Sequence, residues 1–195
     1  MLTAHPYPSP LESRTVSGRS CGSCSLCCKV FPVPEVDSAR SVMCRHCIPG
    51  KGCGVHASRP AICRNFFCNW LLLDTLGPEW QPEQAKMVLQ TIAFPDALGL
   101  VVHVDPDFPD HWRIEPYYAR IKGWALKAQQ QTKATGPVYF VMAEIHRREF
   151  LVLPDREVDL GEFEDDEEIE VERRVSNGRI EVSAKKKHKP PPAGP

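Results

Sequence analysis

The sequence CGSCSLCCKVFPVPEVDSARSVMCRHCIPGKGCGVHASRPAICRNFFC, from Cys21 to Cys68, contains all nine cysteines of this 195-residue chain. Cysteines gathered in this way bind a metal, pair in disulfides or form a redox-active set of thiols. The choice among these three roles decides how the N-terminal part of the chain folds.

Two observations argue against a disulfide framework. The first residues, MLTAHPYPSPLESRTVSG, show no basic region followed by an apolar run, so we expect no secretory signal and a cytoplasmic location. Stable disulfides are uncommon in a reducing cytosol, where closely spaced cysteines more often bind metal. An odd number of cysteines that includes the adjacent pair Cys27 and Cys28 also suits disulfide pairing poorly. The sequence therefore favours a metal site.

The composition of the segment also favours a metal. Its interior holds few large apolar residues, and a short, loop-rich segment gains too little from burial to offset the entropy lost on ordering. Binding of a structural metal contributes ~10–16 kcal/mol of apparent free energy, and this free energy stabilises the fold. We therefore expect the metal to hold this segment together.

The spacing of the cysteines leaves the kind of metal and the number of sites open. Two-residue gaps, which let neighbouring thiolates converge on one ion, separate Cys21 from Cys24, Cys24 from Cys27 and Cys44 from Cys47. Nine thiols fill two four-ligand sites with one left over, or one site with several non-ligands. Close pairs suit tetrahedral zinc, for which we have a slight preference. A triple completed by a remote cysteine also holds iron–sulfur clusters.

Local charge and local structure add two expectations. Six Lys and Arg side chains in the segment face only Glu35 and Asp37, and this positive excess is expected to lower the pKa values of the thiols. Ser58 and Pro60 predict the start of a helix that continues through AICRNFFCNWLLL. On a regular helix Cys63 and Cys68 would lie about 140° apart. Either the helix breaks between them or they serve different sites.

These motifs resemble the YkgJ-type cysteine-cluster family, a zinc- or iron-chelating domain named for its CxxCxxCC motif. The opening CGSCSLCC (21–28) matches that motif, and CGVHASRPAICRNFFC (53–68) is similar to the family's closing pattern, with His56 in place of its Tyr. The resemblance covers about a quarter of the chain. It implies a set of eight metal ligands and leaves Cys47 as an additional thiol. The implied ligands are Cys21, Cys24, Cys27, Cys28, Cys44, Cys53, Cys63 and Cys68.

The rest of the chain predicts an α+β fold. We expect a flexible leader over residues 1–18, the cysteine module over 19–75 closed by its helix, and a small body over 76–161. In this body, KMVLQTIA (86–93) pairs with LGLVVHVD (98–105), a helix begins at Pro116, and PVYFVMAE (137–144) pairs with REFLVLP (148–154). The short spacings favour hairpins, so we expect a small antiparallel sheet with one helix on it and the module packed against it.

The C-terminal part has a different composition. An acidic run and a hairpin around Asn177–Gly178 are expected over residues 162–183, followed by a disordered basic, Pro-rich tail over 184–195. The net charge of −1 gives no general attraction to nucleic acid, and the longest apolar runs are too short to cross a membrane.

The function expected from the sequence is zinc or iron binding in a bacterial-type cytoplasmic protein, with no membrane or nucleic-acid partner. No phosphate-binding loop, nucleophile elbow or carboxylate pair indicates a reaction, so catalytic residues and a protein partner are not predicted. His103 and Asp105 are read as ordinary polar residues at a strand end. Two alternatives stay open: a metal-dependent or iron–sulfur redox or group-transfer enzyme, and a zinc-stapled module that binds RNA or protein.

Overall fold

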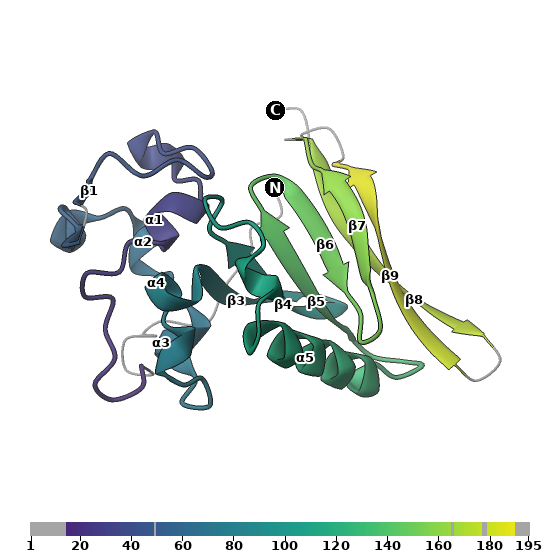
Figure 1. The fold of residues 1–195 in the computed structure, drawn as a ribbon. Coiled ribbons are helices and arrows are strands. Elements are labelled where there is room, and N and C mark those ends of the chain that lie inside the picture. The colour runs from purple at the N-terminus through teal and green to yellow at the C-terminus, as the bar shows by residue number, and fades with distance from the viewer. Residues whose placement is uncertain (1–14, 49, 165, 177–178, 190–195) are drawn as a thin grey trace. The chain divides into compact units, whose positions relative to one another are not determined.

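The computed structural model of the chain describes residues 15–48, 50–164, 166–176 and 179–189, and it is a mixed α+β structure (Figure 1). The chain divides into two compact units. The cysteine unit comprises the described residues within Tyr7–Gln90 and Val102–Ile114, and the sheet unit comprises those within Thr91–Val101 and Glu115–Pro195. Strands β3 (Met87–Phe94) and β4 (Ala97–Val104) contribute residues to both units.

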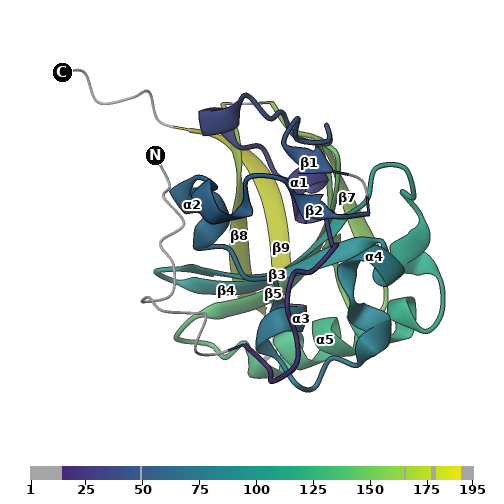
Figure 2. The ribbon, with the colours of Figure 1, turned by 90° about the vertical axis from the view of Figure 1, so that its left-hand side faces the viewer.

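The cysteine unit is built from very short elements (Figure 2). Outside β3 and β4, none of its described helices or strands exceeds four residues. The only pairing of these short strands is antiparallel, between β1 and β2, and sets Cys47 opposite Cys53. The elements are α1 (Cys27–Val30), η2 (Pro34–Val36), β1 (Cys47–Ile48), β2 (Gly52–Cys53), η3 (His56–Ser58), α2 (Ala61–Arg64), α3 (Asn69–Leu72), η4 (Pro78–Trp80), α4 (Pro82–Ala85) and η5 (His111–Arg113).

A small apolar cluster forms the core beside the cysteines. Its buried members come from α1 and α3, from the residues directly before these two helices and from β3, and Phe31, Phe66, Phe67 and Trp70 pack around them. Cys68 belongs to this core and is 8% exposed, so one thiol of the unit is part of the apolar packing. The buried residues are Leu26, Val30, Cys68, Leu71 and Val88.

The predicted closing helix is broken between Cys63 and Cys68. A break there is one of the two alternatives that their spacing left open. Helix α2 ends at Arg64, Cys68 adopts an extended conformation with φ −68° and ψ 155°, and α3 begins at Asn69. The non-helical segment allows the adjacent residues Phe66 and Phe67 both to contact the core, whereas a helix would direct them about 100° apart. Packing of this aromatic pair therefore overrides the helical pattern.

The sheet unit is organised by a five-stranded sheet of order β3-β4-β5-β6-β7. Strand β5 (Val138–Ile145) pairs antiparallel with β6 (Arg148–Val152), and β6 with β7 (Glu157–Glu162). Val138, the first residue of β5, donates its N–H to the carbonyl of Asp96, which directly precedes β4. Because these neighbouring strands meet at their first residues, they run in the same direction. The prediction of a wholly antiparallel sheet was wrong here, since the connection between β4 and β5 is a long crossover rather than a hairpin.

Both faces of the sheet are covered within the sheet unit. Helix α5 (Tyr117–Gln131) lies along β5 and buries Ile121, Ala125 and Ala128 (Figure 1). On the side of Phe140, the antiparallel hairpin of β8 (Glu167–Ser176) and β9 (Arg179–His188) packs its apolar side chains onto the sheet. The ring of Phe140 occupies the space over Gly99, where a Cβ atom would lie 2.2 Å from the ring.

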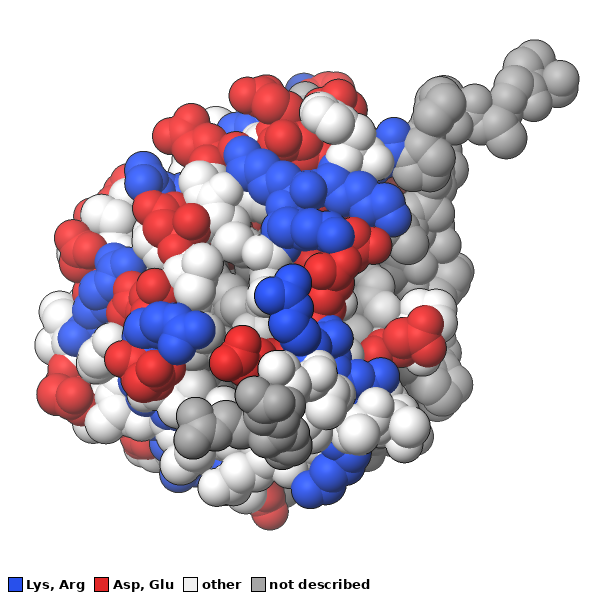
Figure 3. Space-filling model, turned by 90° about the vertical axis from the view of Figure 1, so that its right-hand side faces the viewer, with Lys and Arg blue, Asp and Glu red and all other residues white. Residues whose placement is uncertain are grey.

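The hairpin extends further than the sequence predicted. Residues 184–188, expected to belong to a disordered tail, form the end of β9. The prediction overlooked that Ala184 packs on the core while the adjacent lysines pair with glutamates of β8. Lys185 and Lys187 lie 3.1 and 3.3 Å from Glu170, and Figure 3 shows basic and acidic side chains side by side on this face. The predicted turn at Asn177–Gly178, residues 1–14 of the leader and residues 190–195 of the tail lie outside the described residues.

Among the described residues, no helix combines the length and the apolar character needed to cross a bilayer.

One arginine ties the start of the described chain to α3. The guanidinium of Arg19 donates to the carbonyls of Trp70 (2.5 Å), Leu73 (2.9 Å) and Leu76 (2.6 Å), and lies over the Trp70 ring. The Trp70 carbonyl belongs to the last turn of α3 and those of Leu73 and Leu76 follow the helix, where acceptors are left without intrahelical donors. Val16 adds a backbone hydrogen bond to Leu71. The segment before the first cysteine is thereby fixed.

Replacement of Arg19 tests this attachment. We expect Arg19→Ala to lower the free energy of unfolding by about 2–3 kcal/mol, because hydrogen bonds to a charged donor are lost together. Arg19→Lys should recover only part of the loss, since an ammonium group cannot match the planar fork of three bonds. Urea denaturation measures both variants. Arg156→Ala, which removes an exposed pair with Asp155, is the control and should stay within about 0.5 kcal/mol of wild type. An Arg19→Lys variant as stable as wild type would contradict the proposed geometry.

Candidate metal centre

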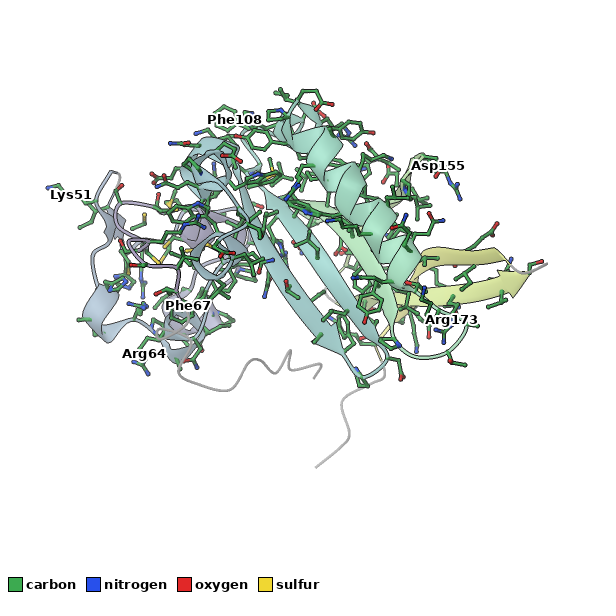
Figure 4. The ribbon with its side chains drawn as sticks, turned by 90° about the horizontal axis from the view of Figure 1, so that it is seen from below. Lys51, Arg64, Phe67, Phe108, Asp155 and Arg173 are labelled. Carbon is green, nitrogen blue, oxygen red and sulfur yellow. The ribbon has the colours of Figure 1, made fainter. Side chains whose placement is uncertain are left out.

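All nine cysteines lie in the cysteine unit and all are free thiols. Figure 4 shows sulfur atoms gathered among the loops between the labelled Lys51 and Phe67. Neighbouring thiols affect one another's pKa values in two overlapping sets, which Cys28 links because it also affects Cys21 and Cys27. Every thiol that the sequence proposed as a ligand therefore lies in the cysteine unit, along with Cys47.

The first set surrounds the turn that opens the segment and consists of Cys21, Cys24, Cys27 and Cys68. Burial raises the pKa of Cys24 to about 11, and the nearby Cys68 and Cys21 contribute to this rise. The pKa of Cys68 is raised by burial and by Cys21, while the N–H groups of Leu71 and Trp70 oppose the rise. Cys68 approaches the first turn because the chain is extended at this residue.

The second set consists of Cys28, Cys44, Cys47, Cys53 and Cys63. The thiol of Cys28 hydrogen-bonds to that of Cys47, and the pKa of Cys63 is raised by burial and by Cys28, Cys53 and Cys44. Backbone hydrogen bonds hold the segments together, since Cys44 donates its N–H to the carbonyl of Cys28 at 2.9 Å and Cys47 donates to that of Cys44 at 2.9 Å. The turn from 44 to 47 therefore lies on the end of α1.

The two sets are next to each other at two places. Cys27 and Cys28 are neighbours in α1, and their thiols hydrogen-bond, which lowers the pKa of Cys28 to about 7 and raises that of Cys27. In addition, Gly52 of β2, with φ +85°, packs against the first turn so closely that a Cβ atom would lie 2.7 Å from the carbonyl oxygen of Gly22. A glycine at position 52 is therefore required for the β1–β2 ribbon to approach the first set.

Most of the Lys and Arg side chains in the segment contact groups other than the thiols. The Lys29 ammonium lies 2.6 Å from Asp105 and also pairs with Asp107, while Arg45 pairs with Asp37 at 3.4 Å. Arg59 lowers the pKa of Cys21, but burial outweighs this effect and the pKa of Cys21 is raised. The expectation of generally lowered thiol pKa values was therefore wrong, because burial is the larger effect.

His103 and Asp105 contact different side chains. The Nε2 atom of His103 lies 3.0 Å from the side-chain oxygen of Gln90, and its ring meets Phe31 edge-on at 4.5 Å. Asp105 instead pairs with Lys29, and both side chains are nearly buried, at 10% and 12% exposed. The pair attaches α1 to the end of β4. Sequence reasoning missed it, since only the approach of two distant segments brings these residues together.

The side-chain arrangement bears directly on metal binding. Within residues 15–48, 50–164, 166–176 and 179–189, no three His, Cys, Asp or Glu side chains are grouped so that they could hold a metal ion. The thiols lie near one another without converging on a common point. His46 and His56 contact Arg45 and Arg59 respectively.

Comparison with known proteins gave no match to a protein-family model, a curated protein or a solved structure.

Replacement of two glycines tests the close approach of the β1–β2 ribbon to the first set. We expect Gly52→Ala to destabilise the protein by about 2–3 kcal/mol, since the new methyl group meets the Gly22 carbonyl at a residue with positive φ. Gly50→Ala is the matched control, because Gly50 also has a positive φ of +72° but a Cβ atom there would have no neighbour within 4 Å. It should cost about 1 kcal/mol. Thermal unfolding measures both, and equal losses would contradict the close approach.

The burial of His103 predicts a pH dependence of stability. Burial, together with the charge of Arg40, lowers the pKa of His103 to about 3. The unfolded chain, with a His pKa of about 6.5, therefore binds a proton more readily than the folded one. Unfolding free energy should fall as pH drops from 6.5 towards 3, by up to about 1.4 kcal/mol per pH unit from this residue.

Substitution isolates this contribution. The slope of unfolding free energy against pH should be flatter in His103→Gln, and His188→Gln, at an exposed histidine, should keep the wild-type slope. Urea titrations between pH 4 and 7 give the slopes. Equal slopes in wild type and His103→Gln would show that this histidine takes up its proton without unfolding.

Proposed function

We propose that the cysteine unit binds zinc or iron through its thiolates and that the metal stabilises the fold of this unit. The observation that carries the proposal is the concentration of nine free thiols in one small unit, where they fall into a set of four and a set of five. Four thiolates complete a tetrahedral zinc site or hold an iron–sulfur cluster. The division of the thiols supports two binding positions.

We also propose that the chain is a member of the YkgJ-type cysteine-cluster family. The support is the CxxCxxCC motif at 21–28 and the closing pattern at 53–68. On this proposal Cys21, Cys24, Cys27 and Cys68 hold one metal. The second is held by Cys28, Cys44, Cys53 and Cys63, and Cys47 is the additional thiol.

Binding requires the thiols to converge. Rotation of a cysteine about χ1 moves its sulfur by about 3 Å, so the sets can close without refolding of the backbone. The metal also displaces protons from thiols whose pKa values burial has raised, such as that of Cys24. The bound metal would supply a structural cross-link between the opening turn, the β1–β2 ribbon and the two short helices α2 and α3.

Metal content of anaerobically purified protein tests the function. We expect about two zinc ions per chain, or iron with charge-transfer absorption that bleaches on reduction. Removal of the metal by a chelator should lower the melting temperature of the cysteine unit, since binding free energy contributes to folding. A metal-free protein whose nine thiols all react at once, and whose unfolding a chelator leaves unchanged, would overturn the proposal.

The optical spectrum separates the metal-binding role from the enzymatic alternative. A colourless, zinc-loaded protein excludes iron–sulfur redox chemistry at these thiols, whereas a coloured protein that cycles between oxidised and reduced forms favours it.

Substitution of one thiol in each set tests the division. Cys24→Ser and Cys53→Ser should each lower the metal content by about one ion per chain, because each removes a ligand from a different four-ligand site. Cys47→Ser should retain the full content. Mass spectrometry under non-denaturing conditions counts the bound ions. If one of the two ligand variants loses no metal while the other loses both, the thiols do not form two independent sites.

A further inference from the structure

Strand β8 has an edge that no strand of the described chain covers. It pairs with β9 over its whole length, from Glu167 opposite His188 to Ser176 opposite Arg179, and the two form a sheet of their own. The backbone N–H and C=O groups of alternate residues of β8 therefore point away from the hairpin, with no neighbouring strand among the described residues. An open edge of this kind binds an extended chain by adding it as a further strand.

A groove of about 880 Å³ borders this edge. Strand β8 forms one wall, and the other consists of the β3–β4 connection together with the start of β5. All of the lining residues belong to the sheet unit, and the volume falls within the range of ~300–1,000 Å³ that is usual for ligand sites. The lining residues are 94–97, 136–138, 168–174, Ser183 and Lys187.

One end of the groove is fixed, and the side formed by the sheet is apolar. The guanidinium of Arg173 donates to the carbonyls of Lys133 and Gly136 at 2.9 and 2.8 Å, which ties β8 to the residues before β5. Phe94 lines the groove, is 39% exposed and stacks on Phe140. A segment in the groove would meet backbone groups of β8 on one side and this aromatic ring on the other, so its inward side chains should be apolar.

The charges of β8 define the ends of such a segment. Glu170 lies 3.1 Å from Lys185, which also pairs with Glu172, whereas Glu168 and Arg174 form no ion pair with a described residue. Glu168 and Arg174 lie six residues apart and, because side chains alternate along a strand, on the same face of β8. An antiparallel partner strand would therefore place an acidic residue opposite Arg174 and, six residues later, a basic residue opposite Glu168.

A second copy of the chain does not fit this edge. A strand added to β8 lies between β8 and the β3–β4 connection, which is the opposite wall of the groove. The β8 of a second copy carries its own β9 along its other edge, and that strand would occupy the space of residues 94–97. The groove therefore has room for a single extended segment.

We propose that the groove beside β8 binds an extended segment of a partner protein by strand addition. The segment runs antiparallel to β8, with an acidic residue opposite Arg174, a basic residue opposite Glu168 and apolar residues at the alternate positions between them, which face the sheet. This function goes beyond the proposed metal binding and does not depend on it, since the whole groove belongs to the sheet unit.

The test uses full-length protein and the blocked, fluorescein-labelled peptide Asp-Val-Thr-Val-Thr-Val-Lys. We expect saturable binding in the micromolar range by fluorescence anisotropy, and binding at least about five-fold weaker for the charge-exchanged peptide Lys-Val-Thr-Val-Thr-Val-Asp. The double variant Glu168→Lys with Arg174→Glu should reverse this preference. Lys127→Glu, which changes an exposed charge on α5, is the control and should keep the wild-type preference.

N-methylation of the peptide tests the backbone pairing separately. In an added strand the amides at odd positions point to one side and those at even positions to the other, so only one of the two sets donates to β8. Methylation of that set should abolish binding, and methylation of the other set should retain it.

Three results would overturn the proposal. They are no binding at about 1 mM peptide, equal binding of the two N-methylated peptides, and equal binding of the two charge patterns to the wild-type protein. A dimer in sedimentation velocity that Arg174→Glu dissociates would also overturn it, because a second copy would then occupy the edge. Each of these results is independent of the metal content of the protein, so failure of the metal proposal is detected separately.

Discussion

The low content of regular structure in the cysteine unit is the constraint on which the rest of this unit depends. Helices and strands of two to four residues leave most backbone groups without a regular ladder, and the apolar cluster around Leu26 and Val30 is small. Ordering such a segment costs about 1–2 kcal/mol per residue in backbone entropy alone. Stabilisation must therefore come from interactions that link distant points of the chain. Arg19 at the end of α3 and Lys29 with Asp105 at the end of β4 are two of these, and the thiols supply the third.

Electrostatics explains why these links are arranged as they are. Lys29 is adjacent to Cys28 in sequence, yet its ammonium is paired with Asp105 and Asp107. The thiols therefore receive little help from positive charge, and burial keeps the pKa values of Cys24 and Cys68 raised. A buried thiolate without compensation is costly, whereas a bound divalent ion compensates several thiolates at once. The raised pKa values are therefore a cost that a metal bound as proposed has to offset.

The sequence predicted local features well and long-range ones poorly. The strands around Pro95–Asp96, the helix from Tyr117 and the hairpin after β7 follow from periodicity and turn residues, and the structure has all three. Local patterns carry no information on the parallel β4–β5 pairing, which depends on a long crossover, or on the end of β9 over residues 184–188, where Lys185 pairs with glutamates of β8. In the candidate site, the sequence predicted which thiols cluster. It could not predict their division, because the contacts that create it join residues far apart in the chain.

The break between Cys63 and Cys68 connects the fold to the proposed chemistry. An unbroken helix would have placed both thiols on one rigid element and directed them about 140° apart. The chain instead leaves the helix after Arg64 and is extended at Cys68, so that Phe66 and Phe67 pack against the core and Cys68 lies near the first set while Cys63 stays with the second. The packing of Phe66 and Phe67 and the position of Cys68 thus depend on the same departure from helical structure. A substitution that restored the helix would therefore disturb the core and the placement of Cys68 together.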